Sequence, residues 1–201
     1  MIKSKMDYTF YLEADKIALN ISTPWKEYFA NDIWRYQRLL RKIEYFLNCK
    51  KLIIWRPYIK YLNFRRKRLG IRLGFDIPPN VFGPGLSIAH YGTIIVNPFS
   101  RVGENCRIHN CVHIATQCHP RGEPEKCPTI GNNVFIGPGS VIVGDIEIAD
   151  NIAIGANSYV NKSFLESGIT IAGAPAKKIS DKGSENCYFK ATEDLRKRLK
   201  K

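Results

Sequence analysis

The sequence predicts an all-β fold, a parallel β-helix with three short strands in each turn, preceded by an α-helical region. From about residue 77 onward, aliphatic residues recur every six positions. Before residue 70 they recur at spacings of three and four, which marks one face of a helix. The chain has 201 residues, 44% of them hydrophobic and 24% charged, so its composition is that of a globular protein rather than a disordered one.

The six-residue period runs through two blocks of sequence. Val96 leads the first block, which extends to Ile114, and Ile130 leads the second, which continues without a miss to Val160. The loop between them, residues 116–129, is rich in Pro, Gly and charge. In a triangular solenoid each leading side chain points inward and stacks on its equivalent one turn away, with Gly and Asn at the corners. An ordinary antiparallel sheet would not hold so strict a period.

The first 70 residues read as helices. Tyr8 to Asn20 shows one short helical pattern, and Thr23-Pro24 is typical of the start of another. Pro57 opens a last stretch that we expect to end at Gly70. The apolar face of the middle helix is predicted to consist of Ile33, Tyr36, Leu40, Ile43 and Leu47. Mostly on its other side are Arg35, Arg38, Arg41 and Lys42.

We therefore expect three parts. Residues 1–70 form a basic, aromatic-rich helical region, residues 71–180 a β-helical catalytic domain with a loop at 116–129, and residues 181–201 a basic tail that is helical. Aromatic residues in the first part would pack the helices onto the neighbouring domain, stack on sugar rings or lie at a bilayer interface.

Positive charge is concentrated at the two ends of the chain. Residues 1–70 contain 16 Lys and Arg against 6 Asp and Glu, whereas residues 71–180 contain 8 of each. Such a patch suits an anionic polymer, a membrane surface or simply solvent. No nucleic-acid-binding motif accompanies it, so we expect no nucleic-acid partner. No long apolar run or leader is present, which predicts a cytoplasmic protein and leaves peripheral contact with the inner membrane open.

Three segments carry a family resemblance: FDIPPNVFGPGLSIAHYGTIIV, GPGSVIVGDIEIADNIAIGANSYV and IAGAPAKKI. They resemble the hexapeptide-repeat acyltransferases of the serine acetyltransferase-like group, over about residues 70–180. The resemblance implies a left-handed β-helix and acetyl-CoA as co-substrate. It also implies a homotrimer with active sites between subunits, with pairing of trimers left open.

The resemblance places the catalytic base at His90 and its partner carboxylate at Asp76. Transfer of an acetyl group from a thioester to an alcohol needs a base for the hydroxyl proton, and histidine titrates near working pH. A carboxylate would orient the imidazole and stabilise the imidazolium. Without this context His90 would be read as an ordinary surface histidine.

The resemblance also implies that acetyl-CoA lies along the coils, where small residues allow close approach to the backbone. Thr116 would lie near the thioester, while Lys177 and Lys178 would meet the CoA phosphates. Gly137 and Gly155 are equally explained as coil corners. The full set of expected cofactor-binding residues is Thr116, Gly137, Pro138, Gly155, Ala156, Gly173, Ala174, Lys177 and Lys178.

Three expected substrate-binding positions depart from the serine acetyltransferase pattern: Ala89, Lys126 and Cys127. Serine acetyltransferases have an aspartate at the position of Ala89, and an alanine methyl cannot pair with an ammonium. The resemblance to colanic-acid-type enzymes includes the Cys-Pro pair after the loop. These departures predict a sugar hydroxyl of a capsular or other surface polysaccharide as acceptor. Serine O-acetylation and a non-catalytic hexapeptide scaffold are the alternatives.

The histidines and cysteines leave a metal site open but unsupported. His109 and His113 are four residues apart, and Cys118, His119 and Cys127 share the loop. Their spacing matches neither a structural zinc pattern nor that of the related γ-class carbonic anhydrases. We therefore expect no metal.

Overall fold

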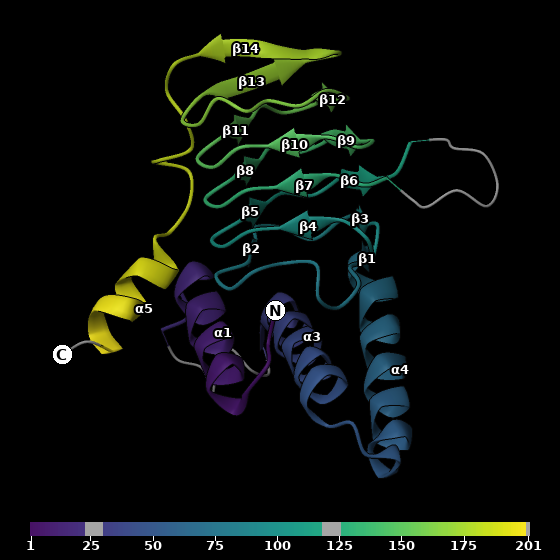
Figure 1. The fold of residues 1–201 in the computed structure, drawn as a ribbon. Helices are drawn as coiled ribbons and strands as arrows, with labels where there is room; N and C mark the ends of the chain where they lie inside the picture. The colour runs from purple at the N-terminus through teal and green to yellow at the C-terminus, as the bar shows by residue number, and fades with distance from the viewer. Residues whose placement is uncertain (23–29, 118–125, 200–201) are drawn as a thin grey trace.

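The structure, a computed structural model, describes residues 1–22, 30–117 and 126–199; helices form the base and a β-helix rises from it (Figure 1). The N-terminal region and the parallel β-structure that follows it confirm the predicted order of elements. None of the helices within these ranges is long and apolar enough to cross a membrane. The helices are α1 (Lys5–Ala18), α3 (Asp32–Cys49), the short η1 (Ile53–Trp55), α4 (Arg56–Leu73) and α5 (Ala191–Leu199).

The β-helix has three sides, each a sheet of short strands. Sheet A contains β1 (Phe75–Asp76), β3 (Ile94–Val96), β6 (Val112–Ala115), β9 (Val141–Val143) and β12 (Tyr159–Val160). Sheet B contains β4 (Arg101–Val102), β7 (Thr129–Ile130) and β10 (Glu147–Ile148). Sheet C contains β2 (Ser87–Ile88), β5 (Arg107–Ile108), β8 (Phe135–Ile136), β11 (Ala153–Ile154), β13 (Thr170–Gly173) and β14 (Ala176–Ser180). The described pairings are parallel, except that β14 folds back antiparallel on β13.

The leading aliphatic residues of the repeat fill the interior of the β-helix. In sheet C, Ile88 pairs in register with Ile108, Ile108 with Ile136, and Ile136 with Ile154. Each of these side chains is at most 1% exposed. Burying one such side chain contributes about 1.5–3 kcal/mol. The predicted inward stacking is therefore present, and it is repeated in every coil.

Asparagines hold the corner between sheets B and C. Asn105, Asn133 and Asn151 have φ values of 54°, 59° and 60°. This left-handed conformation is tolerated by Asn better than by most residues. Their side chains form a ladder in which Asn105 Nδ2 donates to Asn133 Oδ1 at 2.9 Å, and Asn133 Nδ2 to Asn151 Oδ1 at 3.0 Å.

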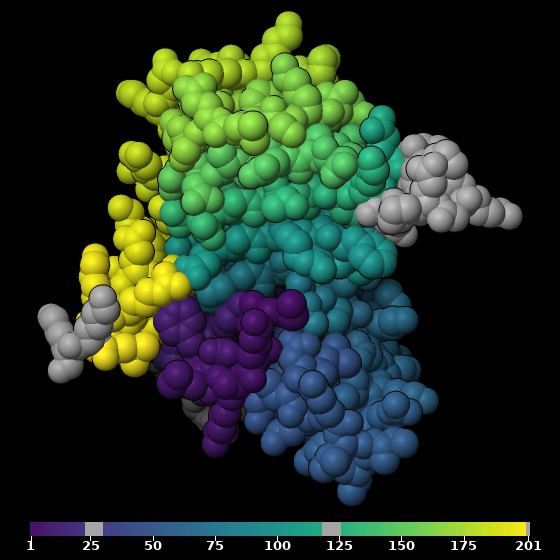
Figure 2. All heavy atoms as spheres, viewed as in Figure 1, coloured from purple at the N-terminus to yellow at the C-terminus, as the bar shows by residue number. Residues whose placement is uncertain are grey.

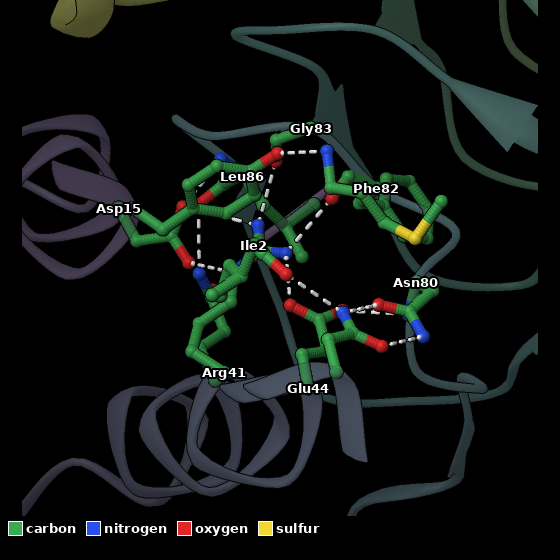
Figure 3. Close-up of polar contacts among 12 residues, drawn as sticks. Ile2, Asp15, Arg41, Glu44, Asn80, Phe82, Gly83 and Leu86 are labelled. Atoms are coloured by element: carbon green, nitrogen blue, oxygen red, sulfur yellow. Dashed lines mark hydrogen bonds and ion pairs between the residues drawn. The ribbon is translucent and has the colours of Figure 1, made fainter. Parts of the chain in front are cut away.

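One buried arginine joins the helices to the first coil (Figure 3). Arg41 of α3 is fully buried, and its Nε donates to Asp15 Oδ2 of α1 at 2.8 Å. Its Nη1 donates to Glu44 Oε2 at 3.0 Å and to the Phe82 carbonyl at 2.8 Å. Its Nη2 donates to the Gly83 carbonyl at 2.6 Å. The expectation that Arg41 lies on the side of α3 away from the core is therefore wrong.

Two other helical expectations need correction. Leu47 is 40% exposed and does not share the buried face of α3. Helix α4 does not end at Gly70 but continues to Leu73, with the left-handed Gly74 (φ 83°) as its cap. Gly70 serves packing instead, because a Cβ there would lie 2.4 Å from the Phe75 carbonyl oxygen. The predicted helix start at Thr23-Pro24 lies outside the described residues.

The C-terminal segment returns along the side of the β-helix and brings α5 next to α1 (Figures 1 and 2). Thr192 N donates to Asn105 Oδ1 at 3.1 Å, and Asn105 Nδ2 donates to Thr192 Oγ1 at 2.9 Å. Arg196 of α5 forms a 2.6 Å ion pair with Glu104. Helix α5 therefore contacts the coil that contains Glu104 and Asn105.

Candidate functional site

The residues that follow the sheet C strands form one continuous edge, where each coil turns from sheet C into sheet A; we call it the C–A edge. Ala89, His109, Gly137 and Gly155 occupy equivalent positions along it. Each donates its backbone N–H to a carbonyl of the next coil, at 2.8–3.1 Å. The edge therefore presents the same backbone pattern from coil to coil, and only the side chains differ.

His90 lies at the C–A edge immediately after Ala89, and its side chain is exposed. Its ring centroid is 5.3 Å from that of His109, and His109 lies 5.1 Å from the ring of Phe135 in an edge-on contact. Burial, the positive charge of Arg107 and the neighbouring His90 together lower the pKa of His109. His109 is therefore harder to protonate than an ordinary histidine, and its ring packs against that of His90.

Asp76, the expected partner carboxylate, lies in β1 of sheet A and is exposed. Among the described residues it forms no hydrogen bond or ion pair with His90. A single chain therefore does not bring this predicted pair into contact. The orienting role of Asp76 stays a prediction.

Small residues continue the C–A edge beyond His109, at the expected cofactor positions. Pro138, Ala156 and Ala174 are exposed. A Cβ on Gly137 would lie 2.8 Å from the Ala156 nitrogen, and one on Gly155 would lie 2.8 Å from the Ala172 Cβ. The close stacking of the coils thus requires glycine at both positions. Because neither residue has a side chain, a ligand can also approach the backbone along this edge.

The two lysines near the end of the β-helix differ in their surroundings. Lys178 Nζ lies 2.6 Å from both Glu166 Oε1 and Asp181 Oδ1. Hydrogen bonds to Asp181 and Glu166 raise the pKa of Lys178. Lys177 is exposed on β14 and forms no ion pair with another described residue. Of the two, Lys177 is the one free to meet a phosphate.

Thr116, Lys126 and Cys127 lie at the other edge of sheet A, where the chain leaves for residues 118–125 and returns. The Thr116 hydroxyl donates to the Gln117 carbonyl at 3.1 Å, and Lys126 Nζ is 3.6 Å from Asp145 Oδ2. Within one chain sheet A separates these residues from His90. The structure therefore places Ala89 next to His90, but not Thr116, Lys126 or Cys127.

The residues considered for a metal site do not gather in the described structure. Within its ranges no three His, Cys, Asp or Glu side chains are grouped so that they could hold a metal ion. His113 lies in β6 on the face of sheet A, whereas His109 lies at the C–A edge. Cys118 and His119 fall outside the described residues.

The contact between His90 and His109 was not predicted from the sequence. The six-residue repeat does not reveal this contact, because the first coil is longer than the regular ones. Ile88 pairs with Ile108, whereas Ile136 pairs with Ile154 eighteen residues on. Counting back eighteen residues from His109 therefore does not lead to Ala89, the residue at the equivalent position in the first coil.

Comparison with known proteins first identifies the repeat. Residues 127–162 match the family model described as bacterial transferase hexapeptide (six repeats). These residues span β7 to β12, three sides of the regular part of the β-helix.

Curated relatives are serine acetyltransferases. The protein from Synechococcus elongatus is 32% identical over 111 residues, which are 55% of this chain and 44% of the relative. The one from Buchnera aphidicola is 32% identical over 142 residues, 67% of this chain and 49% of the relative. That from Helicobacter pylori strain J99 is 33% identical over 108 residues, 53% of this chain and 61% of the relative. The chain thus spans roughly half the length of the curated relatives it matches.

Solved structures with the same fold carry the same name. The serine acetyltransferase from Brucella abortus strain S19 superposes with a TM-score of 0.69 at 22% identity, covering 90% of this chain and 72% of that one. The Neisseria gonorrhoeae enzyme in complex with serine gives 0.69 at 24%, covering 88% and 71%. The soybean apoenzyme gives 0.71 at 23%, covering 87% and 70%. These likenesses establish the fold and imply a left-handed β-helix with an N-terminal helical region.

These comparisons overturn the expectation of a polysaccharide acceptor. The relatives and structural neighbours named above are all serine acetyltransferases, and none of them is a capsular or colanic-acid-type enzyme. The expectation rested on Ala89, Lys126 and Cys127. Two of these, Lys126 and Cys127, lie across sheet A from His90 within one chain.

Proposed function

We propose that this protein is an acetyl-CoA-dependent O-acetyltransferase that acetylates serine, with His90 as the general base. The observation that carries the proposal is the C–A edge, where His90 is followed along successive coils by the small residues expected to meet the cofactor. Similarity to serine acetyltransferases supports the acceptor. One structural neighbour is a complex with serine and another, from Brucella abortus strain S19, a complex with coenzyme A.

In the proposed reaction the serine hydroxyl oxygen attacks the thioester carbonyl while His90 removes the hydroxyl proton. The carbon–sulfur bond then breaks, the acetyl group stays on the serine oxygen, and the CoA sulfur leaves with the proton that His90 held. No covalent enzyme intermediate is needed when both substrates are held together. The His109 ring packs on His90 and limits its orientations.

We further propose that the active site is completed by a neighbouring subunit of a homotrimer. Thr116, Lys126 and Cys127 lie at one edge of sheet A and His90 at the other. A neighbour packed edge to edge would bring its Thr116 region towards the His90 edge of this chain. The exposed side chains of Ile95 (46%) and Tyr159 (39%) on sheet A are available to such a contact.

CoA release from acetyl-CoA, followed with L-serine as acceptor, tests the proposal. His90→Ala should lower kcat by at least about a hundredfold, the usual contribution of a general base. His113→Ala serves as the matched control, because it removes a histidine from the face of sheet A rather than from the C–A edge. The proposal fails if serine is not acetylated, or if both variants keep the wild-type rate.

Ala89 offers a sharper test of the acceptor. It directly precedes the base, so a carboxylate introduced there would lie near the ammonium group of a bound serine. We expect Ala89→Asp to lower the KM for serine about tenfold, the effect of a charge-assisted hydrogen bond of about 1.5 kcal/mol. Ala89→Asn, which is of similar size but uncharged, should give little of this gain. An unchanged KM in both variants would mean that serine does not bind at Ala89.

A further inference from the structure

A groove in the helical region has the features of an anion-binding site. It has a volume of about 450 Å³ and lies between α3 and α4, which pack side by side (Figure 1), with Tyr8 of α1 in its wall. This volume is typical of small-ligand sites. The lining residues that the argument uses are Arg35, Arg38, Lys42, Arg65, Arg68 and Arg72.

The groove carries far more positive charge than its surroundings neutralise. Asp32 pairs with Arg35 at 2.6 Å and, more distantly, with Arg72 at 3.6 Å. Lys42, Arg65 and Arg68 form no ion pair with any described residue. Helix α4 contains no acidic residue along its 18 positions. These three cations are therefore available to an anion from outside the chain.

These cations are arranged at a cost to the helices that carry them. Arg65, Arg68 and Arg72 follow one another at spacings of three and four, as do Arg35, Arg38 and Lys42, and like charges at these spacings repel. Two other arginines of the same helices are buried and have partners within the protein. Arg41 and Arg66 point into the protein and are held there, Arg41 by carboxylates and Arg66 by the Ile77 carbonyl.

The aromatic rings of the groove hold the cations in place. Lys42 Nζ lies 5.4 Å from the centroid of the Tyr58 ring, and the Arg65 guanidinium lies 5.8 Å from that of Tyr61. Such contacts leave the N–H groups of the cation free to bind a ligand. Guanidinium groups match phosphate oxygens two at a time, and several of them together favour a ligand with more than one negative charge.

We propose that the α3–α4 groove binds a ligand bearing phosphate groups. Its source is either a soluble polyphosphate compound or the headgroup of an anionic phospholipid, since both present the same oxygens. Its described lining residues include none of those placed at the C–A edge, and its assignment does not depend on the acceptor proposed above.

Binding of inorganic triphosphate to the full chain, measured by isothermal titration calorimetry, tests the first source. The double variant Arg65→Gln/Arg68→Gln should weaken binding at least tenfold. The matched control is Lys60→Gln/Lys67→Gln, which removes the same charge from exposed positions of the same helix that do not line the groove. The control should weaken binding less than threefold. Thermal melts of both variants show whether they fold.

Flotation with vesicles tests the second source. Vesicles of phosphatidylcholine that contain the anionic lipid phosphatidylglycerol are compared with vesicles of phosphatidylcholine alone. Co-flotation that needs the anionic lipid, and that the groove variant loses but the control keeps, assigns the lipid headgroup. The proposal is overturned if neither probe binds, or if groove variant and control weaken binding equally. None of these readouts uses acetyl transfer, so failure of the proposed reaction leaves them unaffected.

Discussion

The β-helix and the helical base differ in whether they bury charged side chains. Inside the β-helix, equivalent aliphatic side chains such as Ile108, Ile136 and Ile154 stack coil upon coil, and charged residues stay outside. The base instead buries Arg41, Asp15 and Glu44 together against the first coil (Figure 3). The β-helix interior therefore consists of many similar apolar contacts, whereas the helical base adds a few buried charged contacts to its apolar ones. Substitutions in the two regions should reveal this difference.

Removal of Arg41 should have the largest effect. Arg41→Met keeps most of the side-chain volume but leaves Asp15 and Glu44 buried without a cation, which costs about 3–5 kcal/mol. Arg35→Met, on the same helix, removes an ion pair with Asp32 that is partly exposed and should cost less than about 1 kcal/mol. Urea unfolding of the two variants measures the difference. Equal losses would show that the buried ion pairs do not hold the base.

A cavity in the β-helix should come next. Ile136→Ala removes a fully buried side chain from the inner stack and should cost about 3 kcal/mol of unfolding free energy. Ile95→Ala, in β3 but 46% exposed, should cost less than about 1 kcal/mol. If each coil contributes equally to stability, the loss of unfolding free energy in Ile108→Ala should match that in Ile136→Ala within about 1 kcal/mol. A much larger loss of unfolding free energy in one of the two variants would mean that the stability of the β-helix depends mainly on one coil.

One substitution at a corner of the β-helix, at Cys111, is expected to increase stability. Cys111 has a φ of 58° at a turn whose equivalents in later coils are Gly139 and Asn157. A left-handed conformation costs most residues about 1–2 kcal/mol, and Asn tolerates it better. Cys111→Asn should therefore raise the free energy of unfolding by up to about 1 kcal/mol, seen as a higher thermal midpoint. Asn157→Cys, the reverse change, should lower it by a similar amount.

The smallest effect concerns the charge state of His109. Its pKa is lowered by burial, Arg107 and His90, and the ring also contacts Phe135. The unfolded chain therefore binds a proton more readily than the folded one. Stability should fall as pH decreases below about 6.5, the ordinary histidine pKa. In His109→Gln the urea midpoint should fall less between pH 7.5 and 5.5, whereas an unchanged pH dependence would mean that His109 titrates normally.

Much of the candidate site could be read from the sequence because it is local in the coil. His109, Gly137 and Gly155 follow strands whose phase the six-residue repeat defines, so their common edge follows from counting. Counting does not place His90 on this edge, because the first coil is longer than the regular ones. The relation of His90 to Asp76, Thr116 and Cys127 could not be obtained in this way. It depends on which corner each occupies and, in our proposal, on a second copy of the chain.

The sequence by itself determined the β-helix, because the repeated aliphatic residues point inward and each coil buries them against the next coil. No segment distant in the sequence is needed for this burial. The sequence also determined that most positive charge lies in the first helices. Only the tertiary structure decided which cations are buried and which line a groove. Arg41 and Arg38 are three residues apart on one helix, and the helical pattern treats both as polar. Their different positions depend on Asp15 and the carbonyls of the first coil, which lie against one side of α3 and accept hydrogen bonds from the buried Arg41.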